Sequence, residues 1–205
     1  MTDQIVSKVD LREVARKRRG SLSSKDRSTA AIALGKQIAW QVAEKTVAGY
    51  YAIGNELDPS PLLNRLRAQN AEICLPVLID ESTMVFRHWE KDSRLEPAGF
   101  GTLGPAKNSP VVEPELILLP LLAFTPTGQR IGYGKGHYDR AIGKLHRQGS
   151  RPVLIGLAFD EQEVPDFPPE VHDISLDAVL TPSGLRRFTK QSVELDATIL
   201  EPVSV

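Results

Sequence analysis

The feature that most constrains this chain is an apolar run followed by a glycine-rich segment, within residues 115–147. Residues 116–119 are all apolar, which predicts a β-strand buried on both faces. Helical spacing resumes over residues 138–147, where Ile142 and Leu145 form the apolar stripe. Between strand and helix lie four glycines within nine residues, Gly128, Gly132, Gly134 and Gly136. A strand, a glycine-rich loop and a helix start in this order favour an anion site, built from backbone N–H groups and the positive helix end.

Charged side chains in the same segment sharpen this prediction. Arg130 and Lys135 are cations on the loop, and Asp139 lies where the helix begins. Cations together with a carboxylate suit a phosphate chain that carries a divalent metal. The segment is not a Walker A loop, because Gly136 stands where Ser or Thr is required, and His137 replaces the third glycine of a dinucleotide fingerprint. The alternative is a mobile glycine loop with solvated cations, and the density of glycines favours the anion site.

Composition excludes several other classes of protein. The chain has 205 residues, 41% of them hydrophobic, and a formal net charge of −1, so one large domain is expected and no basic field indicates nucleic acid. The single cysteine, Cys74, lies in an apolar run and is expected in the core. Neither a membrane span nor a signal-peptide apolar region is apparent, so the expectation is a soluble cytoplasmic protein that binds no membrane.

The N-terminal residues 4–19 read as a helix with Ile5, Val9 and Leu11 on its apolar face. Lys8 and Arg12 are four residues apart and therefore project from the same side. Spacing alone leaves three interpretations open: a clamp on phosphates, a solvated face that also includes residues 16–19, or a weak nucleic-acid arm.

Further elements alternate between helices and apolar strands. We expect helices from Ser23 or Ser24 to about Glu44 and over 59–69, strands at 46–53, Glu72–Leu78, 85–89 (in an edge hairpin), 152–159 and 178–180, a long ordered loop at 94–114, and a variable tail at 185–205. This alternation predicts an α/β fold: a single-domain, three-layer sandwich over residues 1–205 with a mostly parallel, Rossmann-like sheet.

Two acidic residues follow the strand predicted at 46–53. Ligands of open α/β sheets bind beyond the carboxyl ends of the strands, which favours Glu56 and Asp58. Asp58 is expected to cap the following helix instead, whereas Glu56 has no such structural role. Phe86, Trp89 and Phe100 either form a flat wall for an aromatic ligand or belong to the core.

The run RIGYGKGHYDR, preceded by LPLLAFTPTGQ, resembles the signature of the 5-formyltetrahydrofolate cyclo-ligase family. Lys8-Val9-Asp10-Leu11-Arg12 is similar to the K-x-x-L-R pattern with which that family contacts ATP near its start. The similarity extends in order from Lys8 to Thr181, with departures at Gly104 and Thr125, where the family often carries acidic residues.

The resemblance implies a set of site residues. Arg130 and Lys135 are implied as catalytic, Glu56, Tyr51 and Tyr133 as contacts of the folate, and Asp139 and Asp173 as ligands of Mg²⁺. The implied ATP contacts are Lys8, Arg12, Gly128, Arg130, Ile131, Gly132, Tyr133, Gly134, Lys135, Gly136 and Tyr138.

The implied reaction is the ATP-dependent cyclisation of 5-formyltetrahydrofolate to 5,10-methenyltetrahydrofolate, with release of ADP and phosphate. The protein would then be a magnesium-dependent ligase of one-carbon metabolism, with ATP and a reduced folate as partners, as a monomer or weak homodimer. The alternatives are a non-catalytic nucleotide- or folate-binding homologue, and a sugar-phosphate enzyme on a similar fold.

Overall fold

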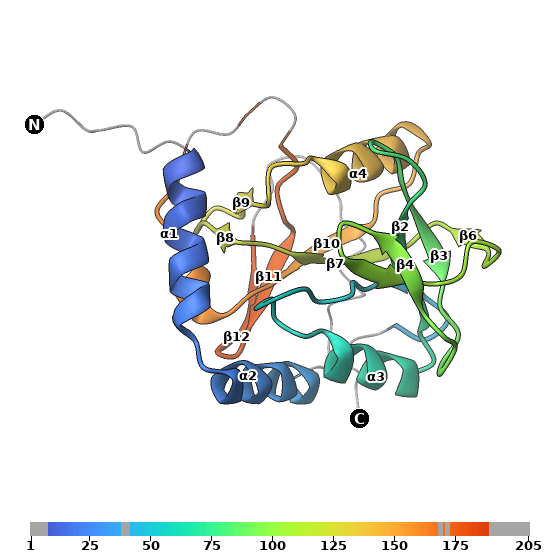
Figure 1. Cartoon of the computed structure of the whole chain (residues 1–205), viewed down its shortest axis with the longest axis horizontal. Helices are drawn as coiled ribbons and strands as arrows, with labels where there is room; N and C mark the ends of the chain where they lie inside the picture. Colours follow the sequence, from blue (N-terminus) through green and yellow to red (C-terminus); the bar gives the residue numbers. More distant parts are fainter. Residues whose placement is uncertain (1–7, 38–41, 168–169, 171–172, 189–205) are drawn as a thin grey trace, which may run out of the picture.

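The computed structural model describes residues 8–37, 42–167, 170 and 173–188 (Figure 1). In chain order the elements are α1 (Lys8–Ser21), α2 (Ser24–Lys36), β1 (Thr46–Ala48), α3 (Ser60–Ala68), β2 (Glu72–Leu78), β3 (Met84–His88), β4 (Glu96–Gly99), β5 (Thr102–Gly104), β6 (Val111–Val112), β7 (Leu116–Pro120), β8 (Ala123–Phe124), β9 (Arg130–Ile131), α4 (His137–Arg147), β10 (Val153–Leu157), the 3₁₀ helix η1 (Asp160–Gln162), β11 (Ala178–Thr181) and β12 (Gly184–Arg187).

The main sheet has the strand order β12-β11-β10-β7-β1-β2-β3-β6. The five strands from β11 to β2 are mutually parallel, whereas β12 and β3 run antiparallel to their inner neighbours. Helices α2 and α3 cover one face and α4 covers the other (Figure 1). The predicted three-layer α/β architecture with a mostly parallel sheet is confirmed.

Strand β7 lies in the middle of both cores. Leu116 and Leu118 pack in the cluster that includes α2 and α3, while Ile117 and Leu119 pack in the cluster that includes α4. All four side chains are fully buried, because alternate residues of a strand point to opposite faces of the sheet. The expectation of a strand buried on both faces is confirmed.

Helix α1 stands at the end of the sheet, next to β8 and β9 (Figure 1). Leu11 and Ala15 are buried in a third, smaller cluster with residues from β9 and from the segment after η1. Val9, which was expected on the apolar face, is instead 68% exposed, because it lies two residues from Leu11 on a helix and so faces another way. Ile5 lies outside the described residues.

The first strand is shorter than predicted. Extended pairing stops at Ala48, and the chain then bends into an irregular segment that leads to α3. The Tyr50 hydroxyl donates a hydrogen bond to the carbonyl of Leu57 at 2.6 Å, which closes this segment on itself. Asp58 accepts a hydrogen bond from the backbone N–H of Ser60, the first residue of α3, at 2.9 Å, although the N-cap of α3 is Pro59 rather than Asp58 as expected.

The segment predicted as a long loop at 94–114 contains three short strands. β4 and β5 form a separate antiparallel hairpin, and β6 pairs with β3. The prediction was wrong because strands of two to four residues are too short to show a periodic pattern. β3, expected at the edge, is therefore covered by β6. Gly104 belongs to the hairpin, where a Cβ would lie 2.9 Å from the Cβ of Ala98 and 3.0 Å from Cγ2 of Val77.

Three more boundaries differ from or refine the predictions. Helix α2 ends at Lys36 rather than near Glu44, and Ser23 is its N-cap, accepting a hydrogen bond from the N–H of Asp26. Residues 184–187, at the start of the predicted tail, form strand β12 on the edge of the sheet beside β11. Phe188 follows and is buried. Cys74 is buried as expected.

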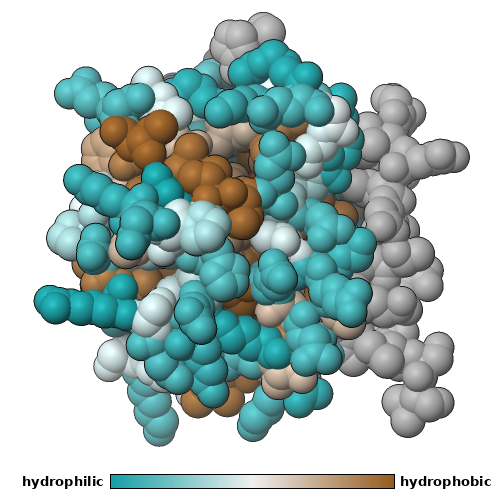
Figure 2. Space-filling model, turned by 90° about the vertical axis from the view of Figure 1, so that its right-hand side faces the viewer, coloured by the Kyte–Doolittle hydropathy of each residue, from teal (hydrophilic) through white to brown (hydrophobic). Residues whose placement is uncertain are grey.

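The opposite edge of the sheet, at β6, belongs to the side of the molecule seen in Figure 2, where hydrophobic groups interrupt a mainly hydrophilic surface. Val111 of β6 is 57% exposed. A strand of two residues offers few free backbone groups, which protects an edge from pairing with another chain. No helix among the described segments is both long and apolar enough to cross a membrane.

The packing around Gly104 predicts that even one added methyl group destabilises the β4–β5 hairpin. We expect Gly104→Ala to lower the free energy of unfolding by about 1–3 kcal/mol, measured by urea denaturation, because Ala98 and Val77 must move. Gly143→Ala is the matched control: its Cβ meets only the end of the Arg147 side chain at 3.5 Å, and alanine in a helix interior stabilises by up to about 1 kcal/mol. Equal stabilities of the two variants would show that the hairpin tolerates a side chain at Gly104.

Candidate active site

Segments that follow the parallel strands meet at one edge of the sheet. The loop carrying Glu56 follows β1, the β8–β9 hairpin and the glycine loop follow β7, and η1 follows β10. Helix α1 contacts β8, β9 and η1 and so lies across this edge. The carboxyl edge of an open α/β sheet is where such folds bind their ligands.

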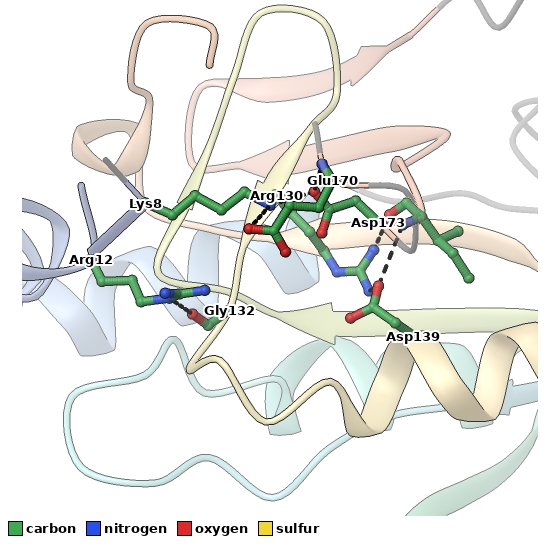
Figure 3. Close-up of polar contacts among 8 residues, drawn as sticks. Lys8, Arg12, Arg130, Gly132, Asp139, Glu170 and Asp173 are labelled. Atoms are coloured by element: carbon green, nitrogen blue, oxygen red, sulfur yellow. Dashed lines mark hydrogen bonds and ion pairs between the residues drawn. The ribbon is translucent and has the colours of Figure 1, made fainter. Parts of the chain in front are cut away.

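Lys8 and Asp173 form an ion pair across this edge (Figure 3). The Lys8 Nζ lies 2.5 Å from Oδ2 of Asp173 and 3.2 Å from Oε1 of Glu170. Burial raises the pKa of Asp173, but its hydrogen bonds with Lys8 and with the N–H of Glu170 outweigh burial, and the pKa is lowered overall. The pair joins α1 to the segment before β11.

Arg130 and Asp139 form a second pair (Figure 3). Arg130 comes from β9 and its Nη2 lies 2.6 Å from Oδ1 of Asp139, in the first turn of α4. Another guanidinium nitrogen donates to the carbonyl of Ile174, next to Asp173. Only 8% of the Arg130 side chain is exposed, and its charge acts on Asp173 as well. The structure thus brings together both predicted metal ligands and two predicted phosphate cations.

Arg12 holds the glycine loop from the side of α1. Its Nε donates to the carbonyl of Gly132 at 3.1 Å, and a Cβ on Gly134 would lie 3.5 Å from its Cζ (Figure 3). Gly134 and Gly136 have φ angles of +87° and +65°, which residues with a side chain rarely adopt. The loop ends at the N-terminus of α4, whose first turn has no side-chain cap and whose backbone N–H groups favour an anion. Lys8 and Arg12 do project from the same side, as expected.

Three of the predicted ATP contacts have packing roles in the structure. A Cβ on Gly128 would lie 2.7 Å from the ring of Phe188, so glycine is required there by that ring. Ile131 is buried in the cluster beneath α1, and Tyr138 packs against the cluster beneath α4. Burial raises the pKa of the Tyr138 hydroxyl.

Phe100 is the member of the predicted aromatic wall that lies beside the loop. Its ring centroid is 5.8 Å from the Lys135 Nζ and 5.0 Å from the His137 ring. Phe86 is buried in the core, and Trp89 packs under the guanidinium of Arg67.

A buried network of polar side chains lies around Glu56. Glu56 is 8% exposed and accepts a hydrogen bond from the N–H of Ile53 at 2.9 Å, and the nearby Tyr133 side chain acts to lower its pKa. The Tyr133 hydroxyl also accepts a hydrogen bond from Arg19 at 2.5 Å, and a second nitrogen of Arg19 donates to Asn55 at 2.9 Å. The two predicted folate contacts Glu56 and Tyr133 therefore lie near each other, and Tyr51 is more exposed than Glu56.

Arg19 and Asn55 were not predicted from the sequence, whose basic run placed Arg19 on a solvated face. It is instead 4% exposed. Its spacing of four residues from Ala15, itself four residues from Leu11, was the available signal, because residues at this spacing share one helix face.

The carboxylates at the site fit Mg²⁺ that arrives bound to phosphates. Among the residues that the structure describes, no three His, Cys, Asp or Glu side chains gather into an all-protein metal site. Asp139 and Asp173 lie on either side of Arg130, which contacts the first and acts on the second. One or two carboxylates completed by phosphate oxygens and water are typical of protein-bound Mg²⁺.

A mostly parallel α/β sheet with cations and a glycine loop at its carboxyl edge is typical of proteins that bind anionic ligands at that edge. The family model for the 5-formyltetrahydrofolate cyclo-ligase family matches residues 4–182. The chain belongs to this family, and the predicted enzyme class is thereby confirmed.

Curated relatives and solved structures agree with this assignment. A 5-formyltetrahydrofolate cyclo-ligase of Escherichia coli K12 is 34% identical over 148 residues, covering 69% of this chain and 80% of that protein. One from Mycolicibacterium smegmatis is 30% identical over 185 residues, covering 86% and 94%. The fold is similar to a 5,10-methenyltetrahydrofolate synthetase of Aquifex aeolicus, with a TM-score of 0.73, 24% identity, and coverage of 91% of this chain and 96% of that one.

The environment of Glu56 predicts a pH dependence of stability. Burial raises the pKa of Glu56 above 4.5, although the Ile53 N–H, Tyr133 and Arg19 oppose this. The folded state therefore binds the proton more tightly than the unfolded state, and the contribution of Glu56 to stability falls as pH rises from about 4.5 through the folded pKa. The free energy of unfolding of wild type, minus that of Glu56→Gln, should fall over this range in urea titrations. Glu13→Gln, whose carboxyl pKa is lowered by Lys17, should show no such fall.

Proposed function

We propose that this protein catalyses the ATP-dependent cyclisation of 5-formyltetrahydrofolate to 5,10-methenyltetrahydrofolate, with ADP and phosphate as the other products and Mg²⁺ bound with ATP. The observation that carries the proposal is the pairing of Lys8 with Asp173 and of Arg130 with Asp139 beside the glycine loop. Phosphates can take over both cations while a metal takes over both carboxylates, so MgATP matches the charges of this site as a unit.

The chemistry requires positioning and charge neutralisation rather than a protein nucleophile. A formamide carbonyl is a poor electrophile, and its oxygen is a poor leaving group. Transfer of the γ-phosphoryl group of ATP to that oxygen gives ADP and an imidate phosphate. The neighbouring folate amine attacks the imidate carbon, loses its proton, and phosphate leaves with the former formyl oxygen. Both nucleophiles belong to the substrate, so the protein contributes orientation and electrostatic stabilisation.

We assign the phosphate contacts to side chains from three elements. Arg130 on β9 carries the planar fork that can hold two oxygens of the phosphoryl group in transfer. Lys8 and Arg12 on α1 would bind the remaining phosphates from outside, with Lys135 and the backbone of residues 132–136 beneath them. Asp139 and Asp173 would hold Mg²⁺, which neutralises phosphate charge when bound.

We place the folate beside Glu56 and beside Tyr133 of the glycine loop. Glu56 would accept hydrogen bonds from the N–H groups of the pterin, with Tyr133 and the more exposed Tyr51 lining the same region. The buried position of the Glu56 carboxylate strengthens such bonds, because little water competes for it. A cytoplasmic location and a monomer or weak homodimer stay predictions.

The first test is the reaction itself. Wild type should form methenyltetrahydrofolate, followed by absorbance, and ADP in a one-to-one ratio. Arg130→Met should lower kcat by about a hundred- to a few-thousand-fold while the KM values change little, because the charge that Arg130 neutralises grows toward the transition state.

Arg151→Met is the control for this experiment, because Arg151 is exposed and bonds only to nearby carbonyls. If wild type binds ATP and the folate but forms no product, the protein is a binding homologue and the proposal is wrong. If Arg130→Met turns over normally, the assignment of Arg130 is wrong while the reaction stands.

A second test follows from the exchange of ion pairs. In Asp173→Asn, Lys8 loses the nearer of its two charged partners and keeps only Glu170 at 3.2 Å among the described residues, so it is more available to phosphate, and ATP without Mg²⁺ should bind equally well or a few-fold more tightly than in wild type. The gain in affinity on adding Mg²⁺ should shrink, because a metal ligand is gone. Calorimetry without Mg²⁺ measures the affinity for metal-free ATP, and calorimetry with Mg²⁺ measures the gain in affinity that the metal brings.

The control is Glu13→Gln, which breaks an exposed ion pair with Lys17 on α1. It should change neither the affinity for metal-free ATP nor the gain in affinity on adding Mg²⁺. Weaker binding of metal-free ATP together with an unchanged Mg²⁺ effect in Asp173→Asn would contradict the exchange.

A further inference from the structure

Arg19 is a buried cation whose partners come from three separate segments. It lies in the last turn of α1, third in the buried stripe after Leu11 and Ala15. A guanidinium at this depth costs free energy unless its donors are satisfied. No described carboxylate lies within ion-pair distance of it. The charge is held instead by three neutral acceptors.

Each acceptor belongs to a different strand ending. Nε of Arg19 donates to Oδ1 of Asn55 at 2.9 Å, Nη1 to the carbonyl of Leu121 at 3.2 Å, and Nη2 to the hydroxyl of Tyr133 at 2.5 Å. Asn55 adjoins Glu56 after β1, and Leu121 directly follows β7. Only the planar fork of arginine presents donors in so many fixed directions at once.

Tyr133 links this cation to Glu56. Its hydroxyl accepts from Arg19 and lies close enough to the Glu56 carboxylate to lower the pKa of Glu56, so the one proton of the hydroxyl is available to that carboxylate. Burial raises the pKa of Tyr133 to about 12, which keeps that proton in place at neutral pH. The guanidinium carbon also lies 5.5 Å from the centre of the Tyr133 ring, so ring and hydroxyl are both held.

We propose that Arg19 is a positioning residue for the folate, which acts by fixing Tyr133 and Asn55 so that the Glu56 carboxylate and the glycine loop keep the geometry that receives this substrate. The inference rests on the proposed function, in which Glu56 binds the pterin. It assigns no direct ligand contact to Arg19, because each of its three guanidinium nitrogens already donates to a protein acceptor.

The experiment compares KM values in the full-length enzyme. Arg19→Met keeps an apolar body of similar length and removes the fork. We expect the KM for 5-formyltetrahydrofolate to rise by about ten- to a hundred-fold, while the KM for ATP and kcat at saturating folate stay within about three-fold. Arg18→Met is the matched control, since Arg18 is the adjacent, exposed arginine and donates to a carbonyl away from Glu56; its kinetics should equal those of wild type.

A double-mutant cycle tests whether Arg19 acts through Tyr133. Tyr133→Phe removes only the hydroxyl and should raise the folate KM, and the Arg19→Met, Tyr133→Phe double variant should be scarcely worse than the more affected single variant. If the increases in folate KM of the two single variants multiply in the double variant, Arg19 does not act through Tyr133 and the inference is overturned.

Stability and turnover separate the remaining outcomes. If Arg19→Met is unfolded by circular dichroism, the half-buried Asn55 provides the second variant: Asn55→Leu must then raise the folate KM selectively, and an unchanged KM overturns the inference. If folded Arg19→Met has an unchanged folate KM, or a raised KM for ATP alone, the inference fails while the function stands. If wild type itself makes no methenyltetrahydrofolate, the proposed function fails instead.

Discussion

Burial of β7 on both faces is the constraint on which the positions of the other elements depend. Its residues alternate between the core under α2 and α3 and the core under α4, so no shift of one residue is possible without exposing one set to the wrong layer. The strand therefore delivers the β8–β9 hairpin and the glycine loop to a fixed place beyond its carboxyl end. Helix α1 packs against the carboxyl end of the sheet through Leu11 and Ala15.

Charge at this place is balanced without any ligand. The cations Lys8 and Arg130 each contact a carboxylate, and Arg19 is held by neutral acceptors, so these three cations form no bare positive cluster. The carboxylates of both pairs are about a third exposed, so water screens each pair in part and a ligand from solvent can reach it. Charge-assisted bonds to phosphate are stronger, which makes the arrangement suited to a ligand that supplies both signs. The site therefore has two parts. The buried network around Arg19 is preformed, whereas the ion pairs of Lys8 and Arg130 can exchange partners when a ligand binds.

The sequence predicted those parts whose signal lies within a few residues. The strand at residues 116–119 was identified from its unbroken apolar run and the stripe of α4 from its helical spacing, the strand Glu72–Leu78 was expected with the same bounds, and Ser23 and Asp58 were expected to cap helices. The hairpin of β4 and β5 was missed because each strand is too short to be periodic. The early end of β1 was missed because the chain bends where the Tyr50 hydroxyl bonds to the carbonyl of Leu57, and the apolar pattern of a strand does not report such a bond.

The same distinction applies to the site. Lys8 and Arg12 follow from a spacing of four, and the glycine loop from its composition, whereas the partners Asp173 and Glu170 of Lys8 lie more than 160 residues away and could be placed there only by the fold. Arg19 is the clearest case: a run of four basic residues at 16–19 reads as solvated, yet one of them continues the buried stripe. Burial of a cation is decided by acceptors from other segments, and no local pattern reports it.

The contact between Phe188 and Gly128 has a practical consequence for anyone who shortens the chain. The segment that matches the family ends at residue 182, and a protein trimmed to it would retain every residue assigned here to the site. It would lose β12 and the aromatic ring that packs on Gly128, two residues before Arg130. The β8–β9 turn would then lose a packing contact, and Arg130 would be less firmly held. Residues 183–188 lie beyond the family match but support the β8–β9 turn, so a shortened protein should still include Phe188.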